Sequence, residues 1–563
     1  MVVEREEMNF DVLFVGGGPA NLSCAIHLMN LINKHNKRIK QGIEKGNIIE
    51  TEDKIAIIEK GSYIGAHGFS GAVMDPIAIN ELMPDFLDRG FPYEAIVNQE
   101  EIYWLSTNKA IKFPFIPKAF KNHGYYIISL SKVSAWLARI AEEMGIVILP
   151  GYSGMKVLYD NDRVTGVQTD DRDIDNNGIP QTPGYNLFSK VTVLGEGPKG
   201  TLTKQIIGKY NLDNSKNVPT YELGCKEIWE LPDGRVEKGK VVHSLGFPLN
   251  KSKPGGGFIY HLSNNRLALG MVTYLSSKDP FLDTHRELQN WKNHTYINSL
   301  LKGGKCIYYG AKAIPSGGYY SIPKLTANGV MILGDSANLL NSKRLKGIHL
   351  AMKSGVLAAE AIFDGLKKDD LSEKQLSNYE YKFSDSWAKK ELYKVRNFSQ
   401  SMVKGFPFPA IFYVGFQTIT YGNGILGRMK GESNHKSTQS IEQFYGKKVN
   451  PPENVKSDSN LIIDKLSDVF LSNTTHNEKQ VSHITINNPS ICKEKCYSQF
   501  GSPCTNYCPA NVYEVVKTEE GGINIKVNFA NCVHCKAADM KCPFDNITWM
   551  PPVGGDGPKY TIL

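Results

Sequence analysis

The chain has 563 residues, of which 41% are hydrophobic and 22% are charged. This composition is typical of a globular protein with room for two or three domains, and it excludes a disordered or fibrous chain. The net charge of +8 is not gathered into a basic run with interleaved aromatic residues, so nucleic-acid binding is not predicted. No apolar run reaches the roughly 20 residues that cross a bilayer, so we expect no membrane-spanning helix.

A buried strand, a glycine turn and a helix are predicted over residues 11–28. Glycines in such a turn let the backbone approach a pyrophosphate, which the free N–H groups at the helix start then hold. The third position of this dinucleotide pattern is Asn21, where glycine is usual. The pattern is weak alone, because glycine turns are common. Its candidate cofactor contacts are Gly16, Gly18, Pro19 and Ala20.

A second buried strand, residues 54–60, follows a polar insertion from Asn33 to Asp53. Glu59 stands at its end, where an acidic side chain can hold the ribose of an adenosine, and Lys60 comes next. The insertion explains why Glu59 lies further along the chain than the usual distance of about 20 residues.

Three later segments complete the pattern of a flavoprotein. A strand is predicted to close the adenine side, another strand leads to a Gly-Asp turn, and an apolar helix begins at a glycine. Each could be purely structural, but all three in this order predict an FAD-binding domain of the glutathione-reductase-like fold. The segments and candidate contacts are 190–197 with Gly197, 325–337 with Gly334 and Asp335, and 346–360 with Gly347.

Two shorter stretches place large apolar side chains beside prolines that prevent regular helix. They are residues 111–120, with Phe113, Phe115, Ile116 and Phe120, and residues 403–419, with Phe406, Phe408 and Phe412. Lys112, Lys118 and Lys404 stand where they could reach lipid head groups. The stretches predict either an interfacial membrane contact or loops packed on the core.

The last seventy-odd residues hold seven of the ten cysteines: Cys492, Cys496, Cys504, Cys508, Cys532, Cys535 and Cys542. Disulfides are disfavoured, because the chain opens without an apolar signal stretch and has few cysteines elsewhere. Zinc would accept the closely spaced pairs. Proline directly follows Cys508 and Cys542, however, and in ferredoxins the cysteine before proline usually serves the other cluster. The tail is therefore predicted to bind iron and sulfur.

Several scattered stretches closely resemble the electron-transfer flavoprotein:ubiquinone oxidoreductase family over nearly the whole chain. They are residues 65–72, 310–315, 321–325, 346–349, 351–355, 390–397 and 508–514, together with Trp136 and its helix. The resemblance implies FAD, a 4Fe-4S cluster, and transfer of electrons from reduced electron-transfer flavoprotein through both to ubiquinone or menaquinone. It also implies a monotopic position on the cytoplasmic face of a bacterial inner membrane or the matrix face of the mitochondrial inner membrane.

The resemblance adds further site residues. Gly65, His67 and Gly71 join the FAD contacts, and Gly255 and Gly256 match the glycines whose backbone meets the quinone head group. The two apolar stretches become membrane contacts. His349 is also a candidate flavin contact, although either it or His67 could equally be a packed or hydrogen-bonded histidine, and no catalytic residue is assigned.

The tail departs from the family pattern, which is Cys-Pro, then Cys-x-x-Cys-x-x-Cys, then Asp four residues on. Ala538 stands at the third position and Cys542 at the Asp position. Cys542 could be the fourth ligand, the cluster could be 3Fe-4S, or Asp539 could complete it. We favour one 4Fe-4S cluster on Cys508, Cys532, Cys535 and Cys542. A second four-thiolate set of Cys492, Cys496, Cys504 and Cys542 in the crossed ferredoxin pattern stays open.

The predicted fold is α/β plus α+β, with an FAD-binding domain (1–90, 126–230 and 320–400) interleaved with an antiparallel quinone-binding and membrane-contact domain (91–125, 231–319 and 401–431). A polar connector (432–485) leads to a ferredoxin-like iron-sulfur domain (486–563). Two other functions compete with the quinone reductase. One is a ferredoxin-tailed, FAD-dependent prenyl-lipid reductase, and the other is a non-catalytic electron carrier.

Overall fold

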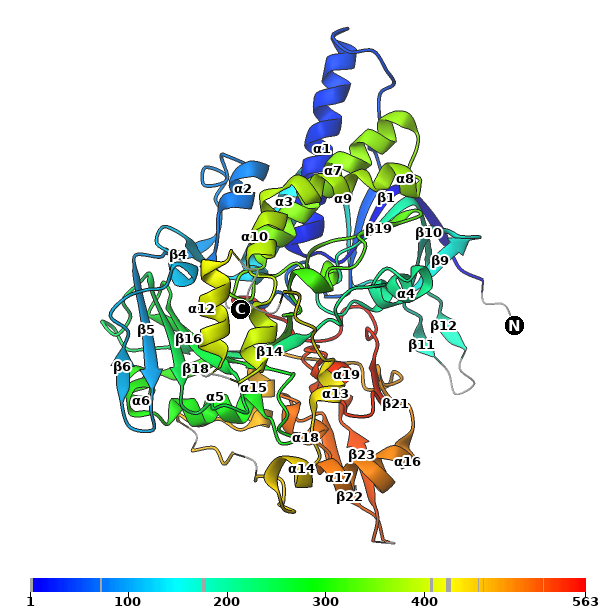
Figure 1. The fold of residues 1–563 in the computed structure, drawn as a ribbon. Coiled ribbons are helices and arrows are strands. Elements are labelled where there is room, and N and C mark those ends of the chain that lie inside the picture. The colour runs from blue at the N-terminus through cyan, green and yellow to red at the C-terminus, as the bar shows by residue number, and fades with distance from the viewer. Residues whose placement is uncertain are drawn as a thin grey trace.

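The structure is a computed structural model that describes residues 4–70, 73–174, 179–405, 409–421, 427–453, 455–458, 460–519 and 521–563. Two large sheets form its frame, with helices above the first and a cysteine-rich tail below the second (Figure 1). This arrangement confirms the predicted α/β plus α+β fold.

The first sheet is the predicted nucleotide-binding sheet. Its main path, in spatial order, is β19 (Thr326–Ala327), β20 (Val330–Ile332), β13 (Asn186–Leu194), β1 (Glu7–Val15), β2 (Ile55–Glu59) and β8 (Val147–Pro150). All pairs from β20 to β8 are parallel. β10 (Arg163–Thr169) and β9 (Gly154–Asp160) extend it from β13 in antiparallel pairs. Its buried parallel strands are continuous apolar runs, because both faces of such a sheet are covered.

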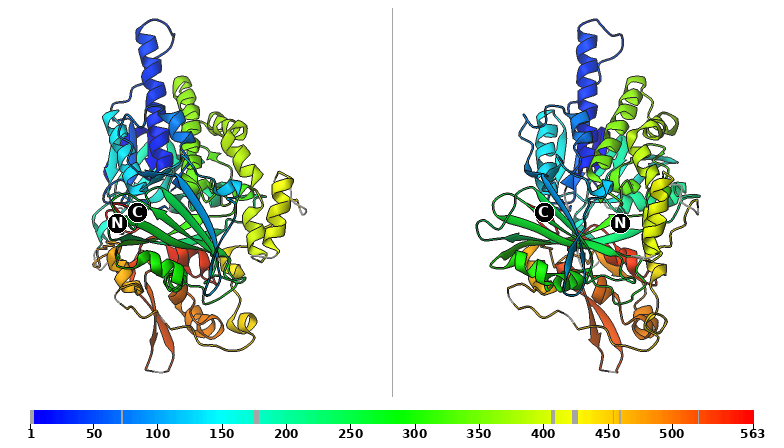
Figure 2. Two further views of the ribbon diagram at one scale, coloured as in Figure 1. Left: turned by 90° about the vertical axis from the view of Figure 1, so that its left-hand side faces the viewer. Right: turned by 60° about the vertical axis from the view of Figure 1, so that its left-hand side comes forward.

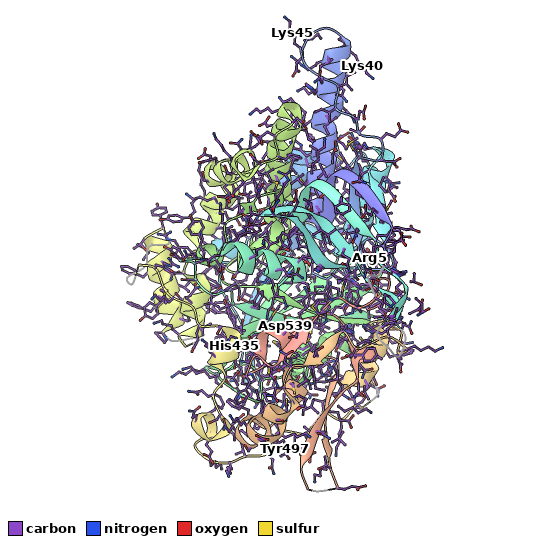
Figure 3. All side chains as sticks on the ribbon, turned by 90° about the vertical axis from the view of Figure 1, so that its right-hand side faces the viewer. Arg5, Lys40, Lys45, His435, Tyr497 and Asp539 are labelled. Carbon is purple, nitrogen blue, oxygen red and sulfur yellow. The ribbon has the colours of Figure 1, made fainter. Side chains whose placement is uncertain are left out.

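Helices cover this sheet, and the glycine turn leads from β1 into the first of them. The main ones are α1 (Pro19–Lys40), α3 (Leu130–Glu143), α4 (Thr201–Tyr210), α7 (Ile348–Lys368), α8 (Glu373–Leu376), α9 (Asn378–Asp385) and α10 (Trp387–Lys394). α1 packs against α7 and α3. The predicted insertion after Asn33 supplies the last turns of α1, which projects from the body with Lys40 and Lys45 at its far end (Figure 3). The returning chain is tied to α1 by two hydrogen bonds between the Asn36 amide and the backbone of Ile49.

The second sheet is mixed but mainly antiparallel. Its spatial order is β18 (Lys305–Pro315), β14 (Tyr221–Glu230), β17 (Arg266–Tyr274), β16 (Gly255–His261), β15 (Lys240–Gly246), β5 (Gln99–Leu105) and β6 (Ala110–Lys112). Only β15 and β5 pair in parallel. α5 (Thr284–Lys292) and α6 (Thr295–Leu301) follow β17 in the chain, and α5 packs on the sheet.

One predicted boundary is corrected by this sheet. Residues 221–230 were assigned to the FAD-binding part, but β14 pairs along its whole length with β17 on one side and β18 on the other. The hydrogen-bond ladders on both sides of β14 make it an inner strand of the second sheet. The boundary therefore precedes Tyr221.

A small three-stranded sheet stands near α2 (Ile77–Leu82). It consists of β3 (Val73–Met74), β7 (Tyr126–Ile128) and β4 (Tyr93–Ile96). A separate hairpin joins β11 (Arg172–Ile174) and β12 (Pro180–Thr182). α11 (Phe398–Val403) and α12 (Ala410–Ile419) lie on one side of the molecule (Figure 2). Among the described residues, no helix combines the length and the apolar character needed to cross a bilayer.

The tail is built from two short antiparallel strand pairs and single-turn helices. β21 (Ile484–Ile486) pairs with β24 (Ile547–Trp549), and β22 (Tyr513–Lys517) forms a hairpin with β23 (Ile523–Val527). The helices are α16 (Pro489–Ile491), α17 (Tyr497–Phe500), α18 (Cys504–Tyr507) and α19 (Ala537–Lys541). Their buried side chains belong to the same core cluster as the second sheet. The tail is thus packed against the body and not suspended from it.

The predicted connector, residues 432–485, is also packed. It contains α13 (Asn434–Ser437), α14 (Ile441–Tyr445) and α15 (Lys465–Leu471). Within α15 the buried Asp468 carboxylate lies 2.7 Å from Nε2 of His285 on the second sheet's helix α5. The polar connector is therefore partly buried at α15, where Lys465, Asp468 and Val469 are buried.

Candidate functional site

A cavity of about 300 Å³ lies where the first sheet, the second sheet and the tail meet. The glycine turn after β1 and the start of α7 border it from the first sheet. Gly224, Phe258 and Tyr260 border it from the second sheet, and Lys536 and Trp549 from the tail. One cavity therefore contacts all three predicted parts of the chain.

Most predicted FAD contacts line this cavity. They are Gly16, Gly18, Pro19, Ala20, Glu59, Lys60, Gly65, His67, Gly197, Asp335 and Gly347. Gly334 lies just behind the wall, and its N–H donates a hydrogen bond to Oγ of Ser354. Gly71 lies outside the described residues. The set was scattered over more than 300 positions of sequence, and the fold brings it together at the ends of the parallel strands, where such sheets bind ligands.

The glycine turn explains the unusual Asn21. Gly16 has φ +101°, and a Cβ there would lie 2.5 Å from the carbonyl oxygen of Gly195. The Asn21 amide donates hydrogen bonds to the carbonyls of Val15 and Gly16, at 2.9 and 2.8 Å. Gly195 leaves the room for that side chain, since a Cβ on Gly195 would meet the Asn21 amide at 2.5 Å. The Asn21 amide thus stabilises the turn through two hydrogen bonds, which a glycine at position 21 could not form.

The start of α1 suits an anionic ligand. Its N-cap is Gly18, and no side chain caps the helix, so its first N–H groups are left for another partner. A Cβ on Gly18 would meet no protein atom within 4 Å. Unsatisfied N–H groups and the helix dipole together attract phosphate. These residues fit the pyrophosphate of FAD.

Glu59 is held by the same turn. Its carboxylate accepts hydrogen bonds from the N–H groups of Gly17 and Gly61, at 2.8 and 2.7 Å. Burial acts to raise the pKa of Glu59, but His67, Lys60 and the Gly17 N–H together hold that pKa well below its usual range. The carboxylate is therefore charged and positioned at the end of β2, as an acceptor for a ribose hydroxyl requires.

Three buried lysines, Lys60, Lys312 and Lys536, line the cavity. Burial and nearby Lys60 together lower the pKa of Lys312 to about 8, while Glu59 opposes the shift. Burial lowers the pKa of Lys536 well below its ordinary value, and its Nζ donates to the carbonyl oxygens of Pro198 and Lys199, each at 3.0 Å. The positive charge of Lys312 is complementary to an anionic dinucleotide.

Two carboxyl groups in the wall have raised pKa values. Burial raises the pKa of Asp335 to about 6, although Lys312 opposes the shift. Burial raises the pKa of Glu222 to about 8, with Tyr274 donating to the carboxyl and opposing the shift. Glu222 was missed by the sequence analysis, because its position in β14 follows no motif. It is a proton-carrying group on the second-sheet side of the cavity.

His349 does not line the cavity. Its Nε2 lies 3.1 Å from Oε1 of Glu391, and its ring stacks on Trp387 at 5.7 Å between ring centroids. The structure therefore corresponds to the packed and hydrogen-bonded alternative for this residue. His67 differs, because it reaches the cavity and lies 2.8 Å from Nζ of Lys60.

Gly255 and Gly256 begin β16, between β15 and β17. A Cβ on Gly255 would lie 2.0 Å from the carbonyl oxygen of Val272. A Cβ on Gly256 would meet only Ser244 and Leu245, at 3.2 Å or more. Neither glycine lines the cavity, but Phe258 and Tyr260 on the same strand do. Close strand packing explains Gly255, whereas the space beside Gly256 is less restricted.

None of the ten cysteines forms a disulfide. The tail thiols form two groups, which we name by position. The inner thiol group is Cys508, Cys532 and Cys535. The outer thiol group is Cys492, Cys496, Cys504 and Cys542. Burial raises the pKa of Cys535 well above its ordinary value, and the neighbouring thiols Cys508 and Cys532 raise it further. For Cys496 the additional causes after burial are Cys542 and Cys492.

Cys542 was expected to complete the inner thiol group, and the structure corrects this. The side-chain Nδ2 of Asn546 lies 3.5 Å from Sγ of Cys492, and the Asn546 N–H donates to Sγ of Cys542 at 3.4 Å. One residue thus joins these two thiols. Cys542, which directly follows α19, is thereby grouped with Cys492.

Asp539 is not directed at the inner thiol group either. Its Oδ2 pairs with Nζ of Lys199 at 3.2 Å and with Nζ of Lys204 at 3.1 Å. These ion pairs join the tail to the first-sheet part of the molecule, and Figure 3 shows Asp539 at the inner end of the tail. Three thiols and Ala538 therefore remain at the inner position.

A histidine group that the sequence analysis missed lies beside the inner thiol group. His476, His483 and His534 have ligand atoms all within 4.8 Å of one another. Nε2 of His476 and Nε2 of His534 share a hydrogen bond at 3.0 Å. Their spacing in sequence follows no familiar metal pattern, and only the fold of the connector over the tail brings them together.

The predicted membrane stretches are partly exposed. Phe115 is 65% exposed and Phe412 is 60% exposed, whereas Phe113, Ile116 and Phe120 are half-buried. α12 also exposes Ile411, Phe416 and Ile419. Phe406 and Phe408 lie outside the described residues. Both stretches lie on the left-hand side of the molecule in Figure 1, where α12 and β6 are labelled.

Two family models match the chain. The 4Fe-4S model of electron transfer flavoprotein-ubiquinone oxidoreductase matches residues 459–561, and the ETF-QO ubiquinone-binding model matches residues 221–314, starting with the first residue of β14. The matches confirm the predicted iron-sulfur tail. They fit the quinone reductase and not the prenyl-lipid reductase or a bare electron carrier.

Relatives matched over nearly their full length belong to the same family as the two family models. The electron transfer flavoprotein-ubiquinone oxidoreductase of Pseudomonas aeruginosa is 40% identical over 99% of this chain and 100% of its own length. The probable enzyme of that name from Acinetobacter baylyi is 39% identical over 100% of this chain and 99% of its own length. The mitochondrial enzyme of Sus scrofa is 37% identical over 99% of this chain and 90% of its own length.

Among solved structures, a geranylgeranyl bacteriochlorophyll reductase-like protein from Thermoplasma acidophilum aligns with a TM-score of 0.53. The two chains are 17% identical, and the alignment covers 73% of this chain and 92% of the other. The likeness therefore shows the fold alone. The fold, the family models and the full-length relatives agree. The chain belongs to the electron transfer flavoprotein-ubiquinone oxidoreductase family.

Proposed function

We propose that this protein oxidises reduced electron transfer flavoprotein and reduces ubiquinone or menaquinone, with FAD in the cavity and an iron-sulfur cluster in the tail. When bound, the cluster supplies one-electron exchange and FAD supplies the change from single electrons to the pair that quinone takes up. The supporting observation is that one cavity touches the glycine turn, the second sheet and the tail.

The chain's own residues have separate tasks in this proposal. The N–H groups at the start of α1 hold the pyrophosphate, and Glu59 accepts from the ribose. Lys312 and Asp335 line the cavity, and we assign them to the flavin end. Glu222 holds a proton on its carboxyl group at neutral pH and lies in the same sheet as Gly255 and Gly256, with β17 between β14 and β16. That carboxyl is a source of one of the protons that quinone reduction consumes.

The quinone head group is proposed to meet the backbone of Gly255 and Gly256. β16 runs from these glycines to Phe258, which lines the cavity. Two residues of strand span roughly 7 Å. A head group beside Gly256 would therefore lie near the flavin end of the cavity without entering it.

The exposed apolar side chains of α12 and of residues 111–120 are proposed to enter one leaflet of a membrane. Large apolar side chains on a short helix gain free energy at the lipid interface, and nearby lysines favour anionic head groups. The protein would then lie on the cytoplasmic face of a bacterial inner membrane or on the matrix face of the mitochondrial inner membrane, within reach of a quinone dissolved in the bilayer.

Steady-state assays with reduced electron transfer flavoprotein and a short-chain ubiquinone test the proposal. Gly256→Val should abolish quinone reduction while reduced flavoprotein still bleaches the bound FAD. Gly208→Ala in α4, where a Cβ meets no atom within 4 Å, is the matched control and should behave as wild type. Failure of the wild type to reduce quinone with any electron transfer flavoprotein would refute the function.

A further inference from the structure

The outer thiol group has no task in the function proposed so far. We propose that Cys492, Cys496, Cys504 and Cys542 hold an iron-sulfur cluster of their own, so that the tail carries two clusters. The inference rests on the proposed function for its role in electron transfer, but the presence of the cluster can be tested without activity.

Two contacts draw the outer thiol group together from separate segments. Asn546 touches Sγ of Cys492 through its side chain and Sγ of Cys542 through its N–H. The carbonyl oxygen of Ser502 lies 3.8 Å from Sγ of Cys504, and the Ser502 N–H donates to the Cys496 sulfur. Residues between 492 and 546 thus converge on one region of the tail.

The two Cys-Pro turns are built alike. The N–H of Val512, four residues after Cys508, donates to its Sγ at 3.4 Å. The N–H of Asn546, four residues after Cys542, donates to its Sγ at the same distance. A short β-strand follows each turn, β22 after the first and β24 after the second. Backbone N–H bonds to sulfur of this kind accompany cluster ligands and set their potentials.

The cysteines are exchanged between the halves as in a two-cluster ferredoxin. There the cysteine before proline in one half ligates the cluster of the other half. Cys508, from the first half, lies with Cys532 and Cys535 of the second. Cys542, from the second half, lies with the cysteines of the first. Ala538 stands where the family pattern has cysteine, so the inner group alone lacks one thiol. The outer group has four.

The spacing favours a cluster over a single metal ion. A tetrahedral zinc site with Zn–S bonds of about 2.3 Å requires sulfur atoms within about 4 Å of one another. Within the described part of the chain, the histidine group is the one set of three or more ligand atoms that lie within 4.8 Å. No three of the seven thiols, all of which lie in the described part of the chain, meet that limit, so they do not form a preformed tetrahedral zinc site.

The outer group lies between the surface and the inner group. Trp549, which lines the FAD cavity, lies beside Cys532 of the inner group. Cys492 of the outer group is only half-buried. Figure 3 shows Tyr497, the neighbour of Cys496, toward the outer end of the tail and Asp539 deeper in the molecule. The outer cluster would therefore be the first centre that a docked protein partner meets.

Iron, acid-labile sulfide and zinc should be counted against FAD in anaerobically purified protein. The wild type should hold about seven or eight irons per chain, and EPR should show two distinct centres. Cys496→Ala should lose one EPR signal and about four irons, and Cys532→Ala should lose the other signal. Cys306→Ala, a buried cysteine outside the tail, is the matched control and should retain both.

About four irons in the wild type, or zinc in place of iron, would overturn the proposal. So would an unchanged iron content in Cys496→Ala. If a variant fails to fold, the wild-type count and its EPR spectra still decide. A full iron content without quinone reduction would refute the proposed function and leave the second cluster standing, whereas quinone reduction with a single cluster would do the reverse.

Discussion

The imidazole ring of His67 meets the ring of His534 edge to face, with 4.9 Å between their centroids. His67 lines the FAD cavity, and His534 lies between Cys532 and Cys535 in the chain. This pair is therefore a direct packing contact between the predicted flavin site and the inner thiol group. Burial and nearby Lys60 together lower the pKa of His67 to about 3, although Glu59 opposes the shift, so the ring is neutral at physiological pH.

His534→Ala should slow reduction of FAD by electron transfer flavoprotein, because it removes the ring that fills the space between the two sites. The loss of a fully buried side chain should also lower the free energy of unfolding by about 1–3 kcal/mol. Stopped-flow absorbance at unchanged iron content separates the two effects. Tyr381→Ala, an exposed side chain on α9, serves as control. An unaltered rate of FAD reduction would remove His534 from the route.

Gly16→Ala and Gly18→Ala should both weaken FAD binding, but for different reasons. Gly16 has φ +101°, and a Cβ on it would meet the Gly195 carbonyl oxygen. The Gly16→Ala variant should therefore lose about 1–3 kcal/mol of stability. A Cβ on Gly18 meets no protein atom, so the apoprotein should unfold as wild type does while FAD affinity falls. Calorimetric FAD titration and apoprotein melting check this. Unchanged affinity in Gly18→Ala would move the pyrophosphate away from α1.

Asn21→Gly restores the usual dinucleotide pattern and yet should destabilise the protein. The variant loses hydrogen bonds to the carbonyls of Val15 and Gly16, at a cost of about 1–3 kcal/mol for two buried bonds. Urea unfolding of the two proteins measures the difference. Equal or greater stability in Asn21→Gly would show that the amide has no stabilising role.

Glu222 should make stability depend on pH. Its folded pKa of about 8 lies above the ordinary value of 4.5, so between these values the native state keeps a proton that the unfolded state has released. The free energy of unfolding should therefore fall as pH rises from 4.5 to 8, by up to about 1.4 kcal/mol per unit. Glu222→Gln should flatten this slope, and the exposed Glu442→Gln should not.

The same carboxyl should affect turnover. In the wild type, quinone reduction should decline as pH rises through 8, because the donor proton is lost there. Glu222→Gln should be slow at all pH values and show no such decline, while FAD reduction remains normal. A wild-type profile retained in Glu222→Gln would exclude this carboxyl as a proton source.

Replacing exposed apolar side chains of α12 should release the protein from membranes. Phe412→Ser and Ile419→Ser change side chains that are 60% and 77% exposed, so the fold should be unaffected. Each removes up to about 2 kcal/mol of apolar transfer free energy, or more than tenfold in vesicle binding. Sedimentation with anionic vesicles measures this. Tyr381→Ser, exposed on α9, is the control, and equal binding by all four proteins would contradict the membrane contact.

The sequence predicted what short contiguous patterns encode. The glycine turn at Gly16, the strand ending at Glu59 and the Gly334-Asp335 turn each combine local chain geometry with a chemical requirement, and the structure gathers them around one cavity. The transfer of β14 to the second sheet was missed because a buried strand has the same apolar pattern in either sheet.

The remaining differences come from contacts between distant segments. The grouping of Cys542 with Cys492 depends on how the chain passes Asn546, and the raised pKa of Glu222 depends on burial by other strands. His476 and His534 meet only because the connector folds back over the tail. Such properties depend on tertiary packing, which spacing in a single sequence does not determine.

The most direct test of the function is an anaerobic stopped-flow experiment with the complete protein in anionic vesicles. Reduced electron transfer flavoprotein should bleach the FAD absorbance in the absence of quinone, and added ubiquinone or menaquinone should restore it within the same turnover. FAD that stays oxidised in the presence of reduced flavoprotein, or reduced FAD that neither quinone reoxidises, would contradict the account.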